Sequence, residues 1–194
     1  MAWGKAGSTD WSSGSARQID SPTFTSNKFL QIMTYTNSGS TNRASFQFGD
    51  PTVDTGNNYA ERKSENGGGD STGASVDHII IHTGNSDNFT VTYMINIATE
   101  EKLSITHSSN GVAGAGNAPG RIETYAKYAE TSNQQTVVRV YDTTLDFTGG
   151  NVSVLGSDLT PAAAIPPTVS DGAIFYETDT NKSYVLYNGS WTEL

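Results

Sequence analysis

The sequence contains no cysteine, few charged residues and no long apolar run. Without cysteine, the 194-residue chain can form neither a disulfide framework nor a thiolate metal site. No stretch of ~18 consecutive apolar residues is present, so we expect no membrane insertion. The first ten residues have neither the basic start nor the apolar run of a secretory signal, and export by that route is not expected.

Positive charge is also scarce. The chain has 11 Lys and Arg against 20 Asp and Glu, which gives a net charge of −9. A protein that binds nucleic acid needs a basic stripe that neutralises the phosphate backbone, and this sequence offers none. We therefore expect no nucleic acid among its partners.

Small polar residues and aromatic residues are abundant instead. Thr (25), Ser (22), Gly (20) and Asn (15) together make up 82 residues, and charged residues are only 16%. Nine Tyr, seven Phe and three Trp fall in short apolar clusters, which argues against disorder. This composition is typical of a turn-rich β protein.

Short β-branched and aromatic segments bounded by Gly, Asn, Asp and Ser predict nine or ten strands. The clearest alternation lies in residues 88–97, where the large apolar residues at 89, 91, 93 and 95 alternate with the mostly polar residues at 90, 92, 94 and 96. Residues 121–129 fit either a helix or a strand, and we favour a strand. The predicted fold is all-β, an antiparallel, jelly-roll-like β-sandwich with a small C-terminal β-meander. The other predicted strands are 28–36, 44–48, 58–63, 76–82, 103–107, 136–141 and 151–155.

Proline marks a boundary near the C-terminus. Three of the six prolines lie within 160–168, where they favour an extended connector that cannot join a central sheet. Beyond it, turns at 179–182 and at Asn188-Gly189 predict three short strands. The predicted organisation is an N-terminal arm (1–20), a β-sandwich domain (21–159), a Pro-rich linker (160–170) and a three-stranded C-terminal module (171–194).

A module of this size can hardly bury a core alone. We therefore expect its aromatic residues to contact the main domain or a neighbouring subunit, and we predict a homo-oligomer, with a trimer favoured. The assembly residues that we predict are Phe175, Tyr176, Tyr184, Tyr187 and Trp191.

The order of features in residues 172–194 is characteristic. Gly172 precedes an aromatic strand, 179–181 reads Asp-Thr-Asn, and a second aromatic strand leads to Asn188-Gly189 and Trp191. This segment of 23 residues resembles a terminal module common in phage tail-fibre and other virion proteins. The body resembles β-sandwich proteins of marine-virus type through 57–69 and 114–119.

The resemblance implies a virion structural protein on a phage or virus particle, either a capsid decoration or a tail fibre or spike subunit. Such a protein is made in the host cytoplasm and resides in the virion. It acts by assembly, and its expected partners are other copies of itself, other virion proteins and a host-surface glycan. The alternative is a stand-alone carbohydrate-binding β-sandwich module of a cell-surface protein.

We expect the protein not to be an enzyme, although two patterns suggest hydrolysis. Residues 69–73 fit Gly-x-Ser-x-Gly, but a nucleophile elbow needs a strand before the serine and a helix after it, and neither is predicted. Asp142 and Asp146 leave a glycoside-hydrolysing spike as a minor alternative. His78 and His82 would stand ~13 Å apart in an extended segment, too far for one metal ion.

Calcium is the one cofactor that the residues suggest. Asp50, Asp54 and Asn57 place hard oxygen ligands within a single loop, and calcium ions often fix such loops in β-sandwiches. These three residues are the candidate calcium ligands, and we expect no other cofactor.

Overall fold

The computed structural model describes residues 3–11, 17–37, 43–84, 87–111, 114–144, 146–158 and 170–194. The chain divides into two compact units, Ala2–Leu159 and Thr160–Leu194. The described residues form strands and turns, and they include no helix that could cross a membrane. Except for Ser170, the predicted Pro-rich linker lies outside the described residues.

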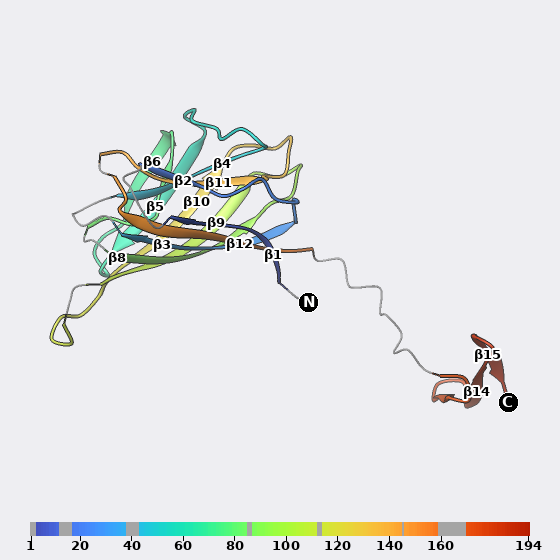
Figure 1. The fold of residues 1–194 in the computed structure, drawn as a ribbon. Coiled ribbons are helices and arrows are strands. Elements are labelled where there is room, and N and C mark those ends of the chain that lie inside the picture. Colours follow the sequence, from blue (N-terminus) through green and yellow to red (C-terminus); the bar gives the residue numbers. More distant parts are fainter. Residues whose placement is uncertain are drawn as a thin grey trace. The chain divides into compact units, whose positions relative to one another are not determined.

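The described residues of the larger unit form twelve strands, whose arrangement can be followed in Figure 1. They are β1 (Gly4–Trp11), β2 (Gln18–Asp20), β3 (Phe29–Asn37), β4 (Ala44–Gly49), β5 (Tyr59–Glu65), β6 (Ser71–Val76), β7 (Ile79–Ile80), β8 (Asp87–Ile95), β9 (Lys102–Gly111), β10 (Gly120–Tyr128), β11 (Val137–Asp142) and β12 (Gly149–Ser157). All of their pairings are antiparallel.

The strands form two sheets. The eight-stranded sheet has the order β1-β12-β3-β8-β9-β10-β5-β6, and the four-stranded sheet has the order β2-β11-β4-β7. We set β5, β6, β9 and β10 aside and renumber the other eight strands from 1 to 8 in chain order. One sheet then has the order 1-8-3-6, and the other has the order 2-7-4-5. This is the strand order of a jelly roll, so the predicted fold class is confirmed.

The four additional strands enlarge only one sheet. β5 and β6 are inserted between β4 and β7, and β9 and β10 are inserted between β8 and β11. All four join the edge formed by β8, so the eight-stranded sheet extends well beyond the jelly-roll framework.

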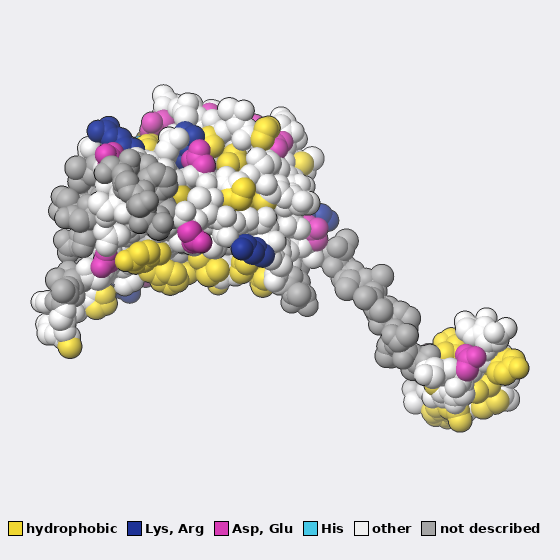
Figure 2. Space-filling view, in the orientation of Figure 1, with side chains coloured by type: hydrophobic (Ala, Val, Ile, Leu, Met, Phe, Trp, Pro, Cys, Tyr) yellow, Lys and Arg dark blue, Asp and Glu magenta, His cyan; other side chains and the backbone are white. Residues whose placement is uncertain are grey.

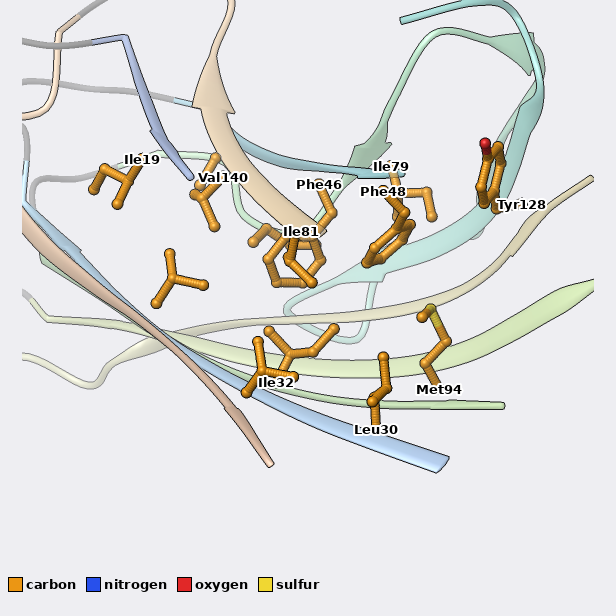
Figure 3. Packing of buried hydrophobic residues seen from close by; sticks show 14 of the residues in the cluster. Ile19, Leu30, Ile32, Phe46, Phe48, Ile79, Ile81, Met94, Tyr128 and Val140 are labelled. Atoms are coloured by element: carbon orange, nitrogen blue, oxygen red, sulfur yellow. The ribbon is translucent and has the colours of Figure 1, made fainter. Parts of the chain in front are cut away.

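The apolar core lies between the two sheets (Figure 3). Phe46 and Phe48 of β4 face Leu30 and Ile32 of β3, and all four side chains are fully buried. Towards one end of the sandwich, the rings of Tyr59 and Tyr128 stack with their centroids 4.6 Å apart. Alternation along each strand directs these residues inward, as expected for a sandwich.

Two predictions about the strands are corrected. The N-terminal arm predicted for residues 1–20 is wrong, because β1 pairs with β12 and β2 pairs with β11. The small residues of β1 show no apolar alternation, and its place in the sheet follows from backbone pairing. The segment predicted as one strand over 76–82 is divided: Val76 is the last residue of β6, and Ile79 and Ile80 form the short strand β7.

The smaller unit is a three-stranded meander. Its strands are β13 (Ile174–Glu177), β14 (Lys182–Tyr187) and β15 (Ser190–Glu193). Asn188 and Gly189 both have positive φ, 51° and 73°, which is the conformation of a two-residue type I′ hairpin turn. Leu186 is the only large hydrophobic side chain of the described part of this unit that is buried.

Candidate functional surfaces and pocket

Strand β9 buries a face made only of polar side chains and exposes its two large apolar residues. The inward positions, from Lys102 to Asn110 in steps of two, are all polar and all buried. The outward positions begin with Leu103 and Ile105, which are 52% and 44% exposed. This is the reverse of the usual arrangement in a sandwich, where the apolar side of each strand faces the other sheet.

Several of the buried polar side chains have hydrogen-bond partners within the sandwich, whereas the buried Ser108 hydroxyl has none. Thr92 of β8 and Thr106 of β9 share a hydroxyl hydrogen bond of 2.7 Å. The hydroxyl of Thr124 on β10 donates to the carbonyl oxygen of Ile80 at 3.0 Å. These bonds reduce the cost of burying hydroxyl groups, so the polar side of the alternation can occupy the interior.

The outer face of the eight-stranded sheet therefore carries a large apolar surface, which we call the outer-sheet patch. Tyr93, Ile105 and Tyr125 lie side by side in one register row across β8, β9 and β10. Figure 2 shows hydrophobic side chains gathered along the lower edge of the larger unit. The patch consists of Trp3, Tyr35, Phe89, Tyr93, Leu103, Ile105 and Tyr125, each between 41% and 52% exposed.

The patch is continuous towards the other edge of the sheet. The Trp3 ring, just before β1, meets the Tyr93 ring edge-on with centroids 6.5 Å apart. Tyr35 of β3 stands directly opposite Phe89 of β8. Monomeric proteins rarely expose so many large apolar side chains on one face, and surfaces of this kind mark interaction sites.

Three ion pairs lie beside the patch, and the Asp87 carboxylate, which accepts hydrogen bonds from Tyr35 and Asn37, lies there as well. Lys127 contacts Glu101 at 2.9 Å, Arg62 contacts Asp70 at 3.1 Å, and Arg121 contacts Glu123 at 3.4 Å. Ion pairing at this face matters for self-association, because the chain has a net charge of −9 and two copies repel each other. Two copies that meet through this face would bring little excess negative charge into contact, because these three acids each have a cationic partner.

The aromatic residues of the C-terminal module divide between its two faces. Phe175 and Tyr184 are opposite each other across β13 and β14, and the Phe175 ring also lies 6.1 Å from the Trp191 ring. Strand alternation places Tyr176 and Tyr187 on the opposite face. The module thus gathers three of the five predicted assembly residues and separates the other two.

A polar pocket of about 200 Å³ lies where β4, β10 and β11 are joined to their loops. Two of the predicted calcium ligands, Asp50 and Asp54, line this pocket, whereas Asn57 does not. The other side of the pocket comes from the segment between β10 and β11, which no sequence pattern predicts as part of this site. The full lining is Asp50, Thr52, Asp54, Tyr128, Glu130, Asn133 and Gln135.

Asp54 anchors one wall of the pocket. Its carboxylate accepts hydrogen bonds from the Gly56 amide at 2.7 Å, the Asn58 side chain at 2.8 Å and the Tyr128 hydroxyl at 2.9 Å. Burial alone would raise the pKa of Asp54, but these three hydrogen bonds outweigh it and hold the pKa below its usual value. The group is therefore ionised at neutral pH.

The histidines and the acid pair serve structural contacts. His78 contacts Asp77, and His82 is buried with Nε2 bonded to the Gly84 carbonyl oxygen at 2.7 Å. Asp142 accepts hydrogen bonds from Thr144, while Asp146 pairs with Arg17, so the two acids have different partners. Within the described residues, no three His, Asp or Glu side chains converge to hold a metal ion.

The Gly-x-Ser-x-Gly match does not form a nucleophile elbow. Its serine, Ser71, begins β6, and the residues that follow it continue as a strand at the edge of the sheet. The strand, tight turn and helix that expose a nucleophile in hydrolases are not found around this serine.

Comparison of the chain with known protein families, with curated proteins and with solved structures gave no match.

Proposed function

We propose that this protein is a non-enzymatic structural protein of a phage or virus particle, which acts by assembling with copies of itself. The observation that carries the proposal is the outer-sheet patch, an exposed apolar face on a sandwich that already has its own core. The resemblance of residues 172–194 to a terminal module of virion proteins supplies the virion setting.

The size of the patch supports contact with another copy. Seven side chains, each about half exposed, offer roughly 700 Å² of accessible surface, since a large aromatic residue has ~150–250 Å² to bury. A standard interface buries ~800 Å² on each partner. The paired charges around the patch also suit a partner with the same composition.

The C-terminal module supports the same proposal. Its described part buries one large hydrophobic residue and exposes six, so it cannot form an independent core. Association through the face of Phe175 and Trp191 would cover those rings. We propose that this module adds a second assembly contact and that the particle surface carries trimers.

The test is the mass of the full-length protein by light scattering. We expect an oligomer that dissociates when Tyr93→Ser and Tyr125→Ser are combined, because the two rings flank Ile105 in one register row and supply much of the aromatic surface of the patch. The matched control combines Glu101→Ser and Lys127→Ser, which removes a neighbouring exposed ion pair and should leave the mass unchanged. A monomeric wild-type protein would contradict assembly.

Deletion of residues 161–194 tests the contribution of the module. A shift from trimers to smaller species would support its role as an assembly element. The body remains suitable for this experiment because its core contains no residue from the smaller unit.

One observation favours the alternative function, a carbohydrate-binding module. Tyr93 and Trp3 form an exposed aromatic corner, and the Gln31 amide lies 3.4 Å from the Tyr93 hydroxyl. Such rings can stack on sugars while neighbouring amides bond the hydroxyl groups. Glycan binding by a monomeric protein, lost in Tyr93→Ser, would favour this alternative over assembly.

A further inference from the structure

We propose that the pocket lined by Asp50, Asp54, Glu130 and Gln135 binds a calcium ion. The inference is independent of the proposed assembly, because the pocket lies at the loops of the sandwich and shares no residue with the outer-sheet patch.

The first observation is the chemistry of the lining. Every side chain that lines the pocket carries oxygen, and none of them is cationic; Lys102, which is not among the lining residues, interacts with Glu130. Calcium takes six to eight oxygen ligands and accepts carboxylates, amide carbonyls, hydroxyls and water in flexible geometry. A lining of oxygen atoms suits a hard cation.

The second observation is a buried acceptor without a partner. Gln135 is 1% exposed, and its side-chain oxygen Oε1 makes no hydrogen bond, whereas its Nε2 donates to the Asn133 carbonyl at 3.2 Å. An unsatisfied buried acceptor costs ~1–3 kcal/mol. A cation bound in the pocket that Gln135 lines would supply the missing partner.

The remaining oxygens show how a site could be completed. Asp50 uses Oδ1 to accept a hydrogen bond from Thr136 at 2.7 Å, which leaves Oδ2 as a ligand. Glu130 uses Oε1 to accept from the amides of Ser132 and Asn133, which leaves its Oε2. Asp54 is already saturated by three donors, so we assign it a positioning role.

The absence of a cluster of three convergent acids in the described residues is consistent with this set. The proposed ligands are one or two carboxylates together with amide and hydroxyl oxygens, which suits calcium and does not suit zinc. A bound ion would connect the loop after β4 to the segment before β11, and these strands are neighbours in the four-stranded sheet.

The experiment measures calcium binding by the full-length, metal-free protein. We expect saturable heat on titration with CaCl₂ and a rise of several degrees in the melting temperature, with a smaller rise in equimolar MgCl₂. Asp50→Asn keeps an acceptor for Thr136 but removes the charge, and it should weaken calcium binding at least tenfold. The control Asp70→Asn, an exposed acid paired with Arg62, should change the affinity less than twofold.

Gln135→Leu provides a second variant. Its readout is the difference in melting temperature with and without calcium, so a change in the stability of the metal-free protein does not affect the conclusion. We expect the calcium-dependent difference to disappear. The proposal is overturned if wild type shows no saturable binding, if magnesium gives the same shift, or if Asp50→Asn binds calcium like wild type.

Discussion

The ammonium group of Lys102 donates a 2.8 Å hydrogen bond to the backbone carbonyl oxygen of Glu130, 28 residues further along the chain. Two further bonds, to the carbonyl oxygens of Ile97 at 2.8 Å and Glu100 at 2.6 Å, use the other two protons of the group. Lys102, the first residue of β9, is fully buried. Its positive charge is stabilised by hydrogen bonds to three backbone carbonyl groups. Burial lowers the pKa of Lys102, although the nearby Glu130 and Glu100 carboxylates oppose the shift.

Lys102→Met should destabilise the protein by about 2–4 kcal/mol, because three carbonyl groups lose a charged donor. The measurement is urea denaturation followed by tryptophan fluorescence. Lys127→Met is the control, since Lys127 is exposed and its pair with Glu101 contributes less than about 1 kcal/mol. Equal stability losses in the two variants would contradict the structural role of Lys102.

Tyr59→Phe should cost about 1–3 kcal/mol although it removes a single oxygen atom. The Tyr59 hydroxyl accepts a hydrogen bond from the Phe48 amide at 3.0 Å and donates to the Asp54 carbonyl at 2.9 Å, so its removal leaves a buried amide without a partner. Thermal unfolding of Tyr59→Phe and Tyr187→Phe gives the comparison. Tyr187 is 73% exposed, and its variant should unfold like wild type.

Stability should fall as the pH drops below 6.5. Burial lowers the pKa of His82 from 6.5, against the opposing effects of its bond to Gly84 and of Glu65. Between the unfolded and folded pKa values the unfolded chain binds more protons, so stability decreases with decreasing pH by up to about 1.4 kcal/mol per unit. Protonation would also place a donor at Nδ1, which has no partner.

The measurement for His82 is the free energy of unfolding between pH 7.5 and 5, compared in wild type and His82→Gln. The variant should show a flatter pH dependence. An unchanged slope would assign the acid sensitivity to other groups. Asp54 adds to the acid sensitivity of the protein at lower pH. Its pKa is lower in the folded protein than the usual 3.8, so its stabilising effect is lost as the pH falls below 3.8 towards the pKa of the folded protein.

Gly49→Ala should disrupt the loop that carries Asp50. A Cβ atom at Gly49 would lie 2.0 Å from the Thr52 carbonyl oxygen, and this backbone atom cannot move without opening the turn. We expect a loss of more than about 3 kcal/mol, in line with other severe overpacking. Gly69→Ala, where no atom lies within 4 Å, is the control, and circular dichroism melts compare the two.

Local patterns in the sequence predict the strands of the jelly roll well. β3, β4 and β8 begin and end within a residue or two of the predicted ranges, and the favoured strand over 121–129 is β10. Asn188-Gly189 forms the predicted turn because its backbone requires two positive φ angles. These features depend on neighbouring residues, which a sequence displays directly.

Features that depend on distant parts of the chain were missed. The alternation in 88–97 locates β8, but it does not reveal that Phe89 and Tyr93 face outward, because this depends on the polar groups that meet Thr92 inside. The burial of Lys102 requires a carbonyl 28 residues away. Likewise, Asp50 and Asp54 were recognised in their loop, whereas Gln135 reaches the same pocket only through the pairing of β4 with β11.

The outward apolar side of β8 and β9 has a consequence for temperature. Folding leaves the exposed part of the outer-sheet patch in water, so this part of the apolar surface contributes nothing to the heat capacity change of folding. Association of copies would bury this surface. Assembly should therefore show a negative heat capacity change of its own, in addition to that of folding. Because apolar burial near room temperature is driven by entropy, the oligomer should strengthen on warming and loosen in the cold.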